Sequence, residues 1–121
     1  MTIEFSSPPW LVAIDLQNIF GEPGSEWFTP DFGKASAGSQ RLRSAFGSRT
    51  ALTRFVAPQT PTGAWVPYYQ NWPFALVPQD DPLYDLVPAF PVDDATVVTR
   101  ETFGKWDAAT SRALGLSLIH I

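Results

Sequence analysis

The sequence of 121 residues contains no cysteine and only one histidine, and few of its residues are charged. Without cysteine, these residues form no disulfide, no thiolate metal site and no cysteine nucleophile. The formal net charge is −4, and Lys and Arg do not cluster along the chain. A basic surface of the kind that binds nucleic acid is therefore excluded, and we expect no nucleic-acid partner.

Long apolar runs are missing as well. The apolar run at 10–14, "WLVAI", is stopped by Asp15 and is far shorter than the roughly 20 residues that a membrane-spanning helix needs. No basic segment precedes this run and no small-residue cleavage site follows it, so it does not resemble a signal peptide. We expect no membrane association and a cytoplasmic location.

Proline and aromatic residues, by contrast, are abundant. Most of the 12 prolines fall between Pro58 and Pro91, in a stretch that is also rich in Trp, Tyr and Phe. A flexible Gly/Ser linker would lack the aromatic side chains that fix a loop in place. We therefore predict a long, ordered excursion packed through its aromatic residues, and long structured loops in compact domains are usually functional.

The spacing of apolar residues predicts strands that alternate with helices. Strands are expected at 10–15, 50–58 and 94–100, helices at about 34–46 and 106–115, and a short helical turn near 82–86. Gly47 is a natural stop for the first helix, and Asp107 is placed to cap the second. This order predicts a three-layer α/β/α domain with a parallel, Rossmann-like sheet and right-handed crossovers.

Asp15 is a candidate site residue because it directly follows the apolar run 10–14, at the carboxyl end of the first predicted strand. An apolar run of this kind suits a parallel strand buried on both faces, and open α/β sheets bind their ligands at the carboxyl ends of the strands. A structural role stays open at this point, since Asp15 could instead cap the strand or accept hydrogen bonds from loop N–H groups.

Three segments together resemble the N-terminal part of the isochorismatase-like cysteine hydrolases. They are "WLVAIDLQNIF" with its Asp-x-Gln-x-x-Phe, "LTRFVAP" at the second strand, and "VVTRETFGKW" at the third strand and the following turn. "PTGAWVPYYQNWPFALVP" is similar to a Trp- and Pro-rich insertion of one subgroup. The resemblance runs over residues 8–115. It implies an isochorismatase-like sheet that this chain follows through the third strand and the next helix.

The resemblance also implies a catalytic Asp-Lys-Cys triad that cleaves the C–N bonds of small amides or related substrates. Asp15 matches the acid, which deprotonates the thiol so that the thiolate can attack a carbonyl. The triad lysine follows the third strand in the family, where this sequence offers Arg100 and Lys105. We favour Lys105, because Arg is always charged and does not readily share a proton. The cysteine follows a fourth strand that these 121 residues do not contain.

Substrate contacts are expected from Gln17, Phe20, Trp65, Tyr69 and Trp72. Gln17 could orient a substrate amide or bond to a loop, Phe20 could form one wall of the pocket, and the aromatics of the excursion could line its mouth or simply pack. The metal-binding branch of the family carries His and Asp after the second strand, whereas this chain reads "RFVAPQTPTGAW". We therefore expect no metal and no cofactor.

The end of the chain has its own interpretation. Residues 116–121, "LSLIHI", match what a widely used sequencing adapter encodes in one reading frame, although a genuine short strand is the alternative. We predict that 1–115 are the N-terminal part of a single hydrolase domain and that 116–121 are a non-native tail, so His120 is not used as a catalytic base.

The leading hypothesis is thus the N-terminal fragment of a metal-independent cysteine hydrolase, inactive by itself, with a small-molecule substrate and a homo-oligomeric state when full length. One alternative is a non-catalytic domain on the same fold that binds a small ligand or a partner. Another is an unrelated doubly wound domain that uses Asp15 on phosphate or Mg²⁺. This last reading is weakened because no Gly-rich phosphate loop or further nearby acid accompanies Asp15.

Overall fold

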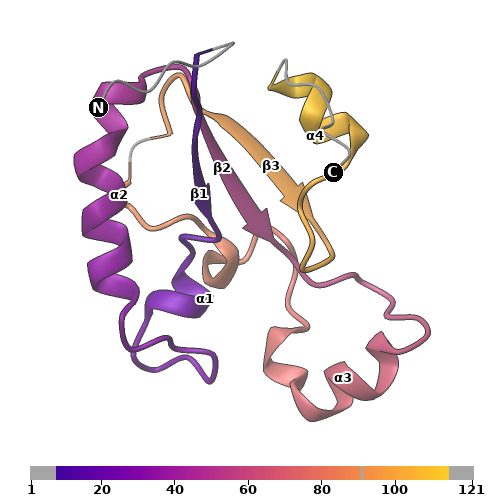
Figure 1. The fold of residues 1–121 in the computed structure, drawn as a ribbon. Coiled ribbons are helices and arrows are strands. Elements are labelled where there is room, and N and C mark those ends of the chain that lie inside the picture. The colour runs from indigo at the N-terminus through magenta and orange to yellow at the C-terminus, as the bar shows by residue number, and fades with distance from the viewer. Residues whose placement is uncertain (1–7, 91, 115–121) are drawn as a thin grey trace.

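Three parallel strands in one open sheet form the centre of the computed structural model, which describes residues 8–90 and 92–114 (Figure 1). The strands are β1 (Leu11–Ile14), β2 (Thr50–Phe55) and β3 (Thr96–Arg100), in the order β1-β2-β3. The helices are α1 (Asn18–Gly21), α2 (Phe32–Phe46), α3 (Trp65–Asn71) and α4 (Ala108–Ala113), with 3-10 turns η1 (Pro73–Ala75) and η2 (Pro82–Tyr84).

The sheet separates two helical layers, and α2 and α4 lie on opposite sides of it (Figure 1). On the α2 side, Ala13 and Leu52 pack with Leu16 and Phe90 in one buried cluster, and Phe32 at the start of α2 packs against it. On the α4 side, Leu114 lines a cavity together with residues of the sheet. The predicted three-layer α/β/α arrangement with a parallel sheet is therefore confirmed.

Strand β2 lies between the other two strands and is buried along nearly its whole length, as a central parallel strand should be. Strand β1 differs, because only Ala13 is buried there while Val12 and Ile14 are 39% and 66% exposed. Among the described residues, no strand pairs with the other edge of β1. The expectation that this apolar run is buried on both faces is therefore wrong for this part of the chain.

The proline-rich excursion between β2 and β3 is ordered and packs through its aromatics. Tyr69 and Tyr84 are buried with Phe55 of β2 in a second core cluster, and Trp65 and Tyr68 pack against it. The turn predicted near 82–86 is η2, whereas α3 was not predicted. Proline disfavours a helix interior, but Pro67 stands in the first turn of α3, where its missing N–H costs nothing.

The other predicted elements are confirmed within a few residues. Helix α2 begins at Phe32, slightly before the predicted start, and ends at Phe46. Gly47 follows it as the predicted stop, and its φ of 56° suits a residue without a side chain. Asp107 caps α4, because its carboxylate accepts a hydrogen bond from the Thr110 N–H. The interpretation of 116–121 as a tail falls outside the described residues. No helix in the described part is long and apolar enough to cross a membrane.

Candidate active site at the carboxyl edge of the sheet

Asp15 and Lys105, 90 residues apart in sequence, meet at the carboxyl ends of the strands. Asp15 is the first residue after β1, and Lys105 lies on the turn that connects β3 to α4. Parallel strands all end at the same edge of the sheet, so their following loops converge there. Lys105 Nζ lies 3.2 Å from Asp15 Oδ2.

This ion pair is shielded from water. The Lys105 side chain is 7% exposed and the Asp15 side chain 20% exposed. A buried ammonium group needs a partner for its charge, and its three protons need acceptors. One faces Asp15, a second is donated to the Phe103 carbonyl at 2.8 Å, and the nitrogen also lies 5.4 Å from the centre of the Phe55 ring. Lys105 is thereby held in one place.

The backbone of Asp15 is unusual. Its φ of 55° falls in the left-handed region, which non-glycine residues rarely adopt but which Asp and Asn tolerate better than most. The Asp15 N–H donates both to the Thr53 carbonyl at 3.1 Å and to Thr53 Oγ1 at 3.0 Å. Thr53 Oγ1 also lies 2.7 Å from Asp15 Oδ1. The chain therefore turns sharply out of β1 and directs the carboxylate toward Lys105.

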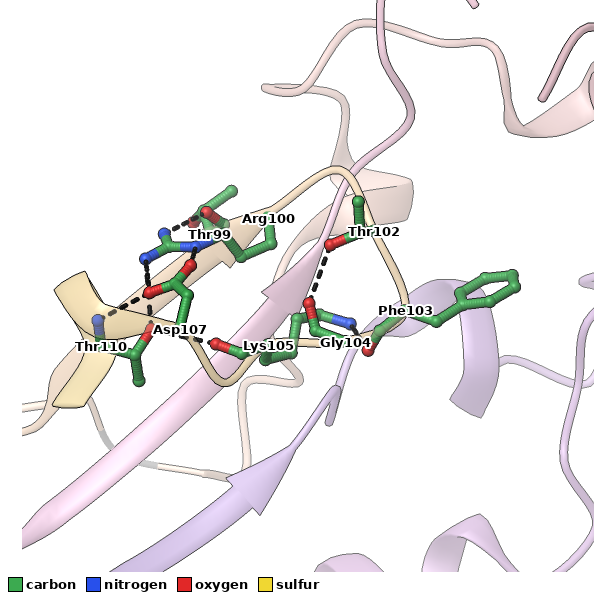
Figure 2. A network of polar contacts seen from close by, with 8 residues as sticks. All are labelled: Thr99, Arg100, Thr102, Phe103, Gly104, Lys105, Asp107 and Thr110. Atoms are coloured by element: carbon green, nitrogen blue, oxygen red, sulfur yellow. Dashed lines mark hydrogen bonds and ion pairs between the residues drawn. The ribbon is translucent and has the colours of Figure 1, made fainter. Parts of the chain in front are cut away.

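Arg100 does not join this pair. It is the last residue of β3, and its guanidinium binds both carboxylate oxygens of Asp107, with Nε at 2.8 Å from Oδ2 and Nη2 at 3.3 Å from Oδ1 (Figure 2). Hydrogen bonds from this guanidinium and from the Thr110 N–H stabilise the ionised carboxylate, so they hold the pKa of Asp107 well below its ordinary value. Of the two cations considered for the triad position, only Lys105 contacts Asp15.

The turn that carries Lys105 is closed by a set of short-range hydrogen bonds (Figure 2). Thr110 Oγ1 donates to the Lys105 carbonyl at 2.9 Å, and Thr102 Oγ1 donates to the Gly104 carbonyl at 2.8 Å. The Arg100–Asp107 pair joins the two ends of the same turn. These bonds fix the backbone from which the lysine side chain reaches back to the sheet.

Gln17 is completely buried, and its side-chain amide forms hydrogen bonds with backbone groups. Its Nε2 donates to the carbonyls of Phe55 and Tyr84 at 2.7 and 2.8 Å, and its Oε1 accepts from the Phe55 N–H at 2.8 Å. Both amide protons are thus used within the chain. Of the two roles considered for Gln17, these contacts favour the structural one, in which it ties α1 to the end of β2 and to η2.

Phe20 lines a cavity of about 380 Å³ beside Asp15. Its walls are mostly apolar, with Ile14, Leu16 and Phe32 as the other large side chains. A second cavity, of about 200 Å³, lies on the α4 side and is lined by Thr53 and Lys105 among others. The ion pair therefore lies between two hollows that have apolar walls.

The aromatic residues of the excursion do not line the cavity beside Asp15. Trp65 packs edge-on against Phe103, with ring centres 5.1 Å apart, and Trp72 packs against Trp27 at 5.9 Å. Tyr69 is 2% exposed, and burial raises the pKa of its phenol. Burial also raises the pKa of Tyr84, to about 12. These contacts favour packing, and Trp65 supports the Lys105 turn through Phe103.

Sequence reasoning did not single out Thr53, although its hydroxyl forms two hydrogen bonds with Asp15 and its carbonyl accepts a third. It stands in a run of β-branched and apolar residues that looks like an ordinary strand, so only its register opposite Ile14 could have indicated its closeness to Asp15. Within residues 8–90 and 92–114, no group of three or more His, Asp or Glu side chains is arranged to hold a metal ion.

Comparison with known proteins supports the fold. No protein-family model matches the sequence, and no curated protein matches it. A solved structure of a cysteine hydrolase from Pseudomonas syringae pv. phaseolicola 1448A is similar, with a TM-score of 0.72 and 18% sequence identity. The similarity covers 88% of this chain and 55% of that one, so the chain spans about half the length of its structural neighbour. The chain therefore shares the fold of that structure, and the predicted α/β fold class is confirmed.

Proposed function

We propose that this chain carries the acid and the lysine of a metal-independent cysteine hydrolase that cleaves the C–N bonds of small amides or related substrates. The observation that supports this proposal is the shielded Asp15–Lys105 pair, 3.2 Å apart, at the carboxyl edge of a parallel sheet. The 121 residues contain no cysteine, so the nucleophile belongs to residues outside this chain. The chain alone is inactive.

In the proposed reaction, the Asp15 carboxylate accepts the proton of the cysteine thiol, and the thiolate attacks the carbonyl carbon of the amide. Lys105 stabilises negative charge as it develops, because its ammonium group is fixed in a shielded site where electrostatic interactions are strong. The C–N bond breaks, the leaving amine takes the proton, and water then hydrolyses the thioester. The products are a carboxylic acid and an amine.

The cavity beside Asp15 would receive the substrate in this scheme. It is open to Asp15 and has apolar walls that include Phe20 and Phe32, so it suits a small ligand with an apolar surface. Arg100 serves the turn and not the chemistry, because its guanidinium pairs with the half-exposed carboxylate of Asp107 and also bonds to Thr110.

The test is an amidase assay on the full-length protein read from the genomic coding sequence, with a panel of small amides. Asp15→Asn and replacement of the nucleophile Cys by Ser should each abolish turnover. Asp94→Asn is the matched control, because Asp94 also has a left-handed φ, 65°, but is exposed and lies away from the site. If the full-length protein binds amides without hydrolysing any, or has no cysteine after its fourth strand, the non-catalytic alternative is correct.

A further inference from the structure

We propose that Thr53 is a positioning residue for Asp15, an inference that rests on the proposed function. Thr53 is in β2, directly opposite Ile14 of β1, and is 4% exposed. Its hydroxyl bridges the backbone N–H and the side chain of Asp15, at 3.0 Å and 2.7 Å. No other threonine of the described strands contacts a carboxylate of the site.

The direction of these two hydrogen bonds is fixed by chemistry. The Asp15 N–H can only donate, so Thr53 Oγ1 accepts there. The single hydroxyl proton is therefore left for Asp15 Oδ1, while Lys105 takes Oδ2. The carboxylate is thus held at both oxygens, by a neutral donor from β2 and a cation from the turn after β3.

Such two-point support matters because Asp15 directly follows β1, an edge strand whose other side is unpaired in the described residues. The carboxylate of a free Asp side chain can rotate about two bonds. The hydrogen bond from Thr53 fixes the plane of the Asp15 carboxylate relative to β2, so that the carboxylate has one orientation when it accepts a proton. Fixing a catalytic group in this way can account for a large part of an enzyme's rate enhancement over the uncatalysed reaction.

Two substitutions separate the hydroxyl from the shape of the side chain. Thr53→Val keeps the branched shape and removes the hydroxyl, whereas Thr53→Ser keeps the hydroxyl. Both retain the bond from the Asp15 N–H to the residue-53 carbonyl. Thr50→Val is the matched control, because it removes an equally buried hydroxyl three residues earlier in β2, where Thr50 contacts Arg43 and not the site.

In the full-length protein, we expect Thr53→Val to lower kcat on the order of 100-fold with KM little changed, because the hydroxyl contacts Asp15 and not the substrate. Thr53→Ser and Thr50→Val should stay near the parent. Equal losses in Thr53→Val and Thr53→Ser, or no loss in either, would overturn the proposal. If Thr53→Val does not fold, Thr53→Ala replaces it with the same two outcomes.

A second measurement keeps this proposal separate from the proposed function. Three-bond NMR couplings to Asp15 Cγ report whether its first side-chain torsion occupies one rotamer. We expect a single rotamer in the parent and in Thr53→Ser, and averaging in Thr53→Val. If the protein proves to lack amidase activity, the proposed function fails, and the couplings alone then decide the role of Thr53. An unchanged single rotamer in Thr53→Val would refute it.

Discussion

The guanidinium of Arg100 binds both carboxylate oxygens of Asp107, and this pair joins the end of β3 to the start of α4. The turn between them carries Lys105, whose ammonium group reaches back across the sheet to Asp15. Two cations that are five residues apart in sequence therefore have different roles. Arg100 shapes the turn, and Lys105 forms the ion pair.

This difference predicts unequal effects of removing each cation. In the full-length protein, Lys105→Met should lower kcat/KM about 100- to 1,000-fold, as expected when a charge-stabilising donor is lost. Arg100→Gln should lower kcat/KM less than about tenfold, because exposed ion pairs contribute little to the stability of a fold. Steady-state kinetics on the two variants measure this order directly. The reverse order would assign the triad position to Arg100.

The Arg100–Asp107 pair also predicts a dependence of stability on pH. The folded protein holds the pKa of Asp107 below its ordinary value of 3.8, so near that pH the unfolded chain binds more protons. The stabilising contribution is therefore complete above about pH 5 and is lost as the pH falls toward the folded pKa. Urea midpoints measured from pH 7 to pH 3 should fall more steeply in the parent than in Asp107→Asn.

Asp107→Asn suits this comparison because Asn can still cap α4 by accepting the Thr110 N–H. The variant removes the titrating group and leaves the capping bond. Identical acid dependence in the two proteins would show that Asp107 does not contribute to it.

Gln17 should matter for folding. Gln17→Met keeps a similar volume but removes the side-chain partner of the buried Phe55 N–H and carbonyl. The Tyr84 carbonyl also loses a bond but keeps the one it accepts from Arg54 Nε. Each such group costs about 1–3 kcal/mol, so a large loss in the free energy of unfolding is expected. Gln40→Met is the control, because Gln40 is exposed on α2 and bonds only to Ser36 in the described structure. Denaturant titration compares the two; equal stability would contradict the burial of this amide.

The open edge of β1 predicts self-association of the 121-residue chain. Leu11 and Asp15 donate their N–H groups toward β2, so by alternation Val12 and Ile14 direct theirs away from it. An apolar strand with free N–H and C=O groups is a template for pairing with another chain. Sedimentation velocity should therefore show oligomers or aggregates.

Val12→Lys should reduce this association, because charge on an edge strand opposes pairing. Leu42→Lys is the control, since Leu42 is similarly exposed, at 49%, but lies on a helix without free edge groups. A monodisperse monomer at every concentration would rule out the edge as a pairing surface.

The sequence was informative where local rules decide the structure. The apolar runs before Asp15 and around Leu52 formed strands, and Asp107 capped a helix as its spacing indicated. Helix α3 was missed because Pro67 and the surrounding aromatics look like a loop unless the proline is placed in the first turn.

The candidate site was predictable only in part, since its contacts are long-range. Asp15 could be found because it ends an apolar strand. That Lys105 reaches it, while Arg100 turns to Asp107, depends on the path of one turn. The contacts of Gln17 and Thr53 depend on strand register and burial, which no single segment encodes.

The left-handed backbone at Asp15 restricts which residues can succeed it during evolution. Most side chains at φ 55° would strain the chain by about 1–2 kcal/mol, whereas Asn and Gly fit. If the proposed function is correct, a descendant that lost hydrolysis but kept the fold should carry Asn or Gly at position 15 more often than Ala or Ser. The residue type at position 15 would then distinguish catalytic members from paralogues that have lost activity.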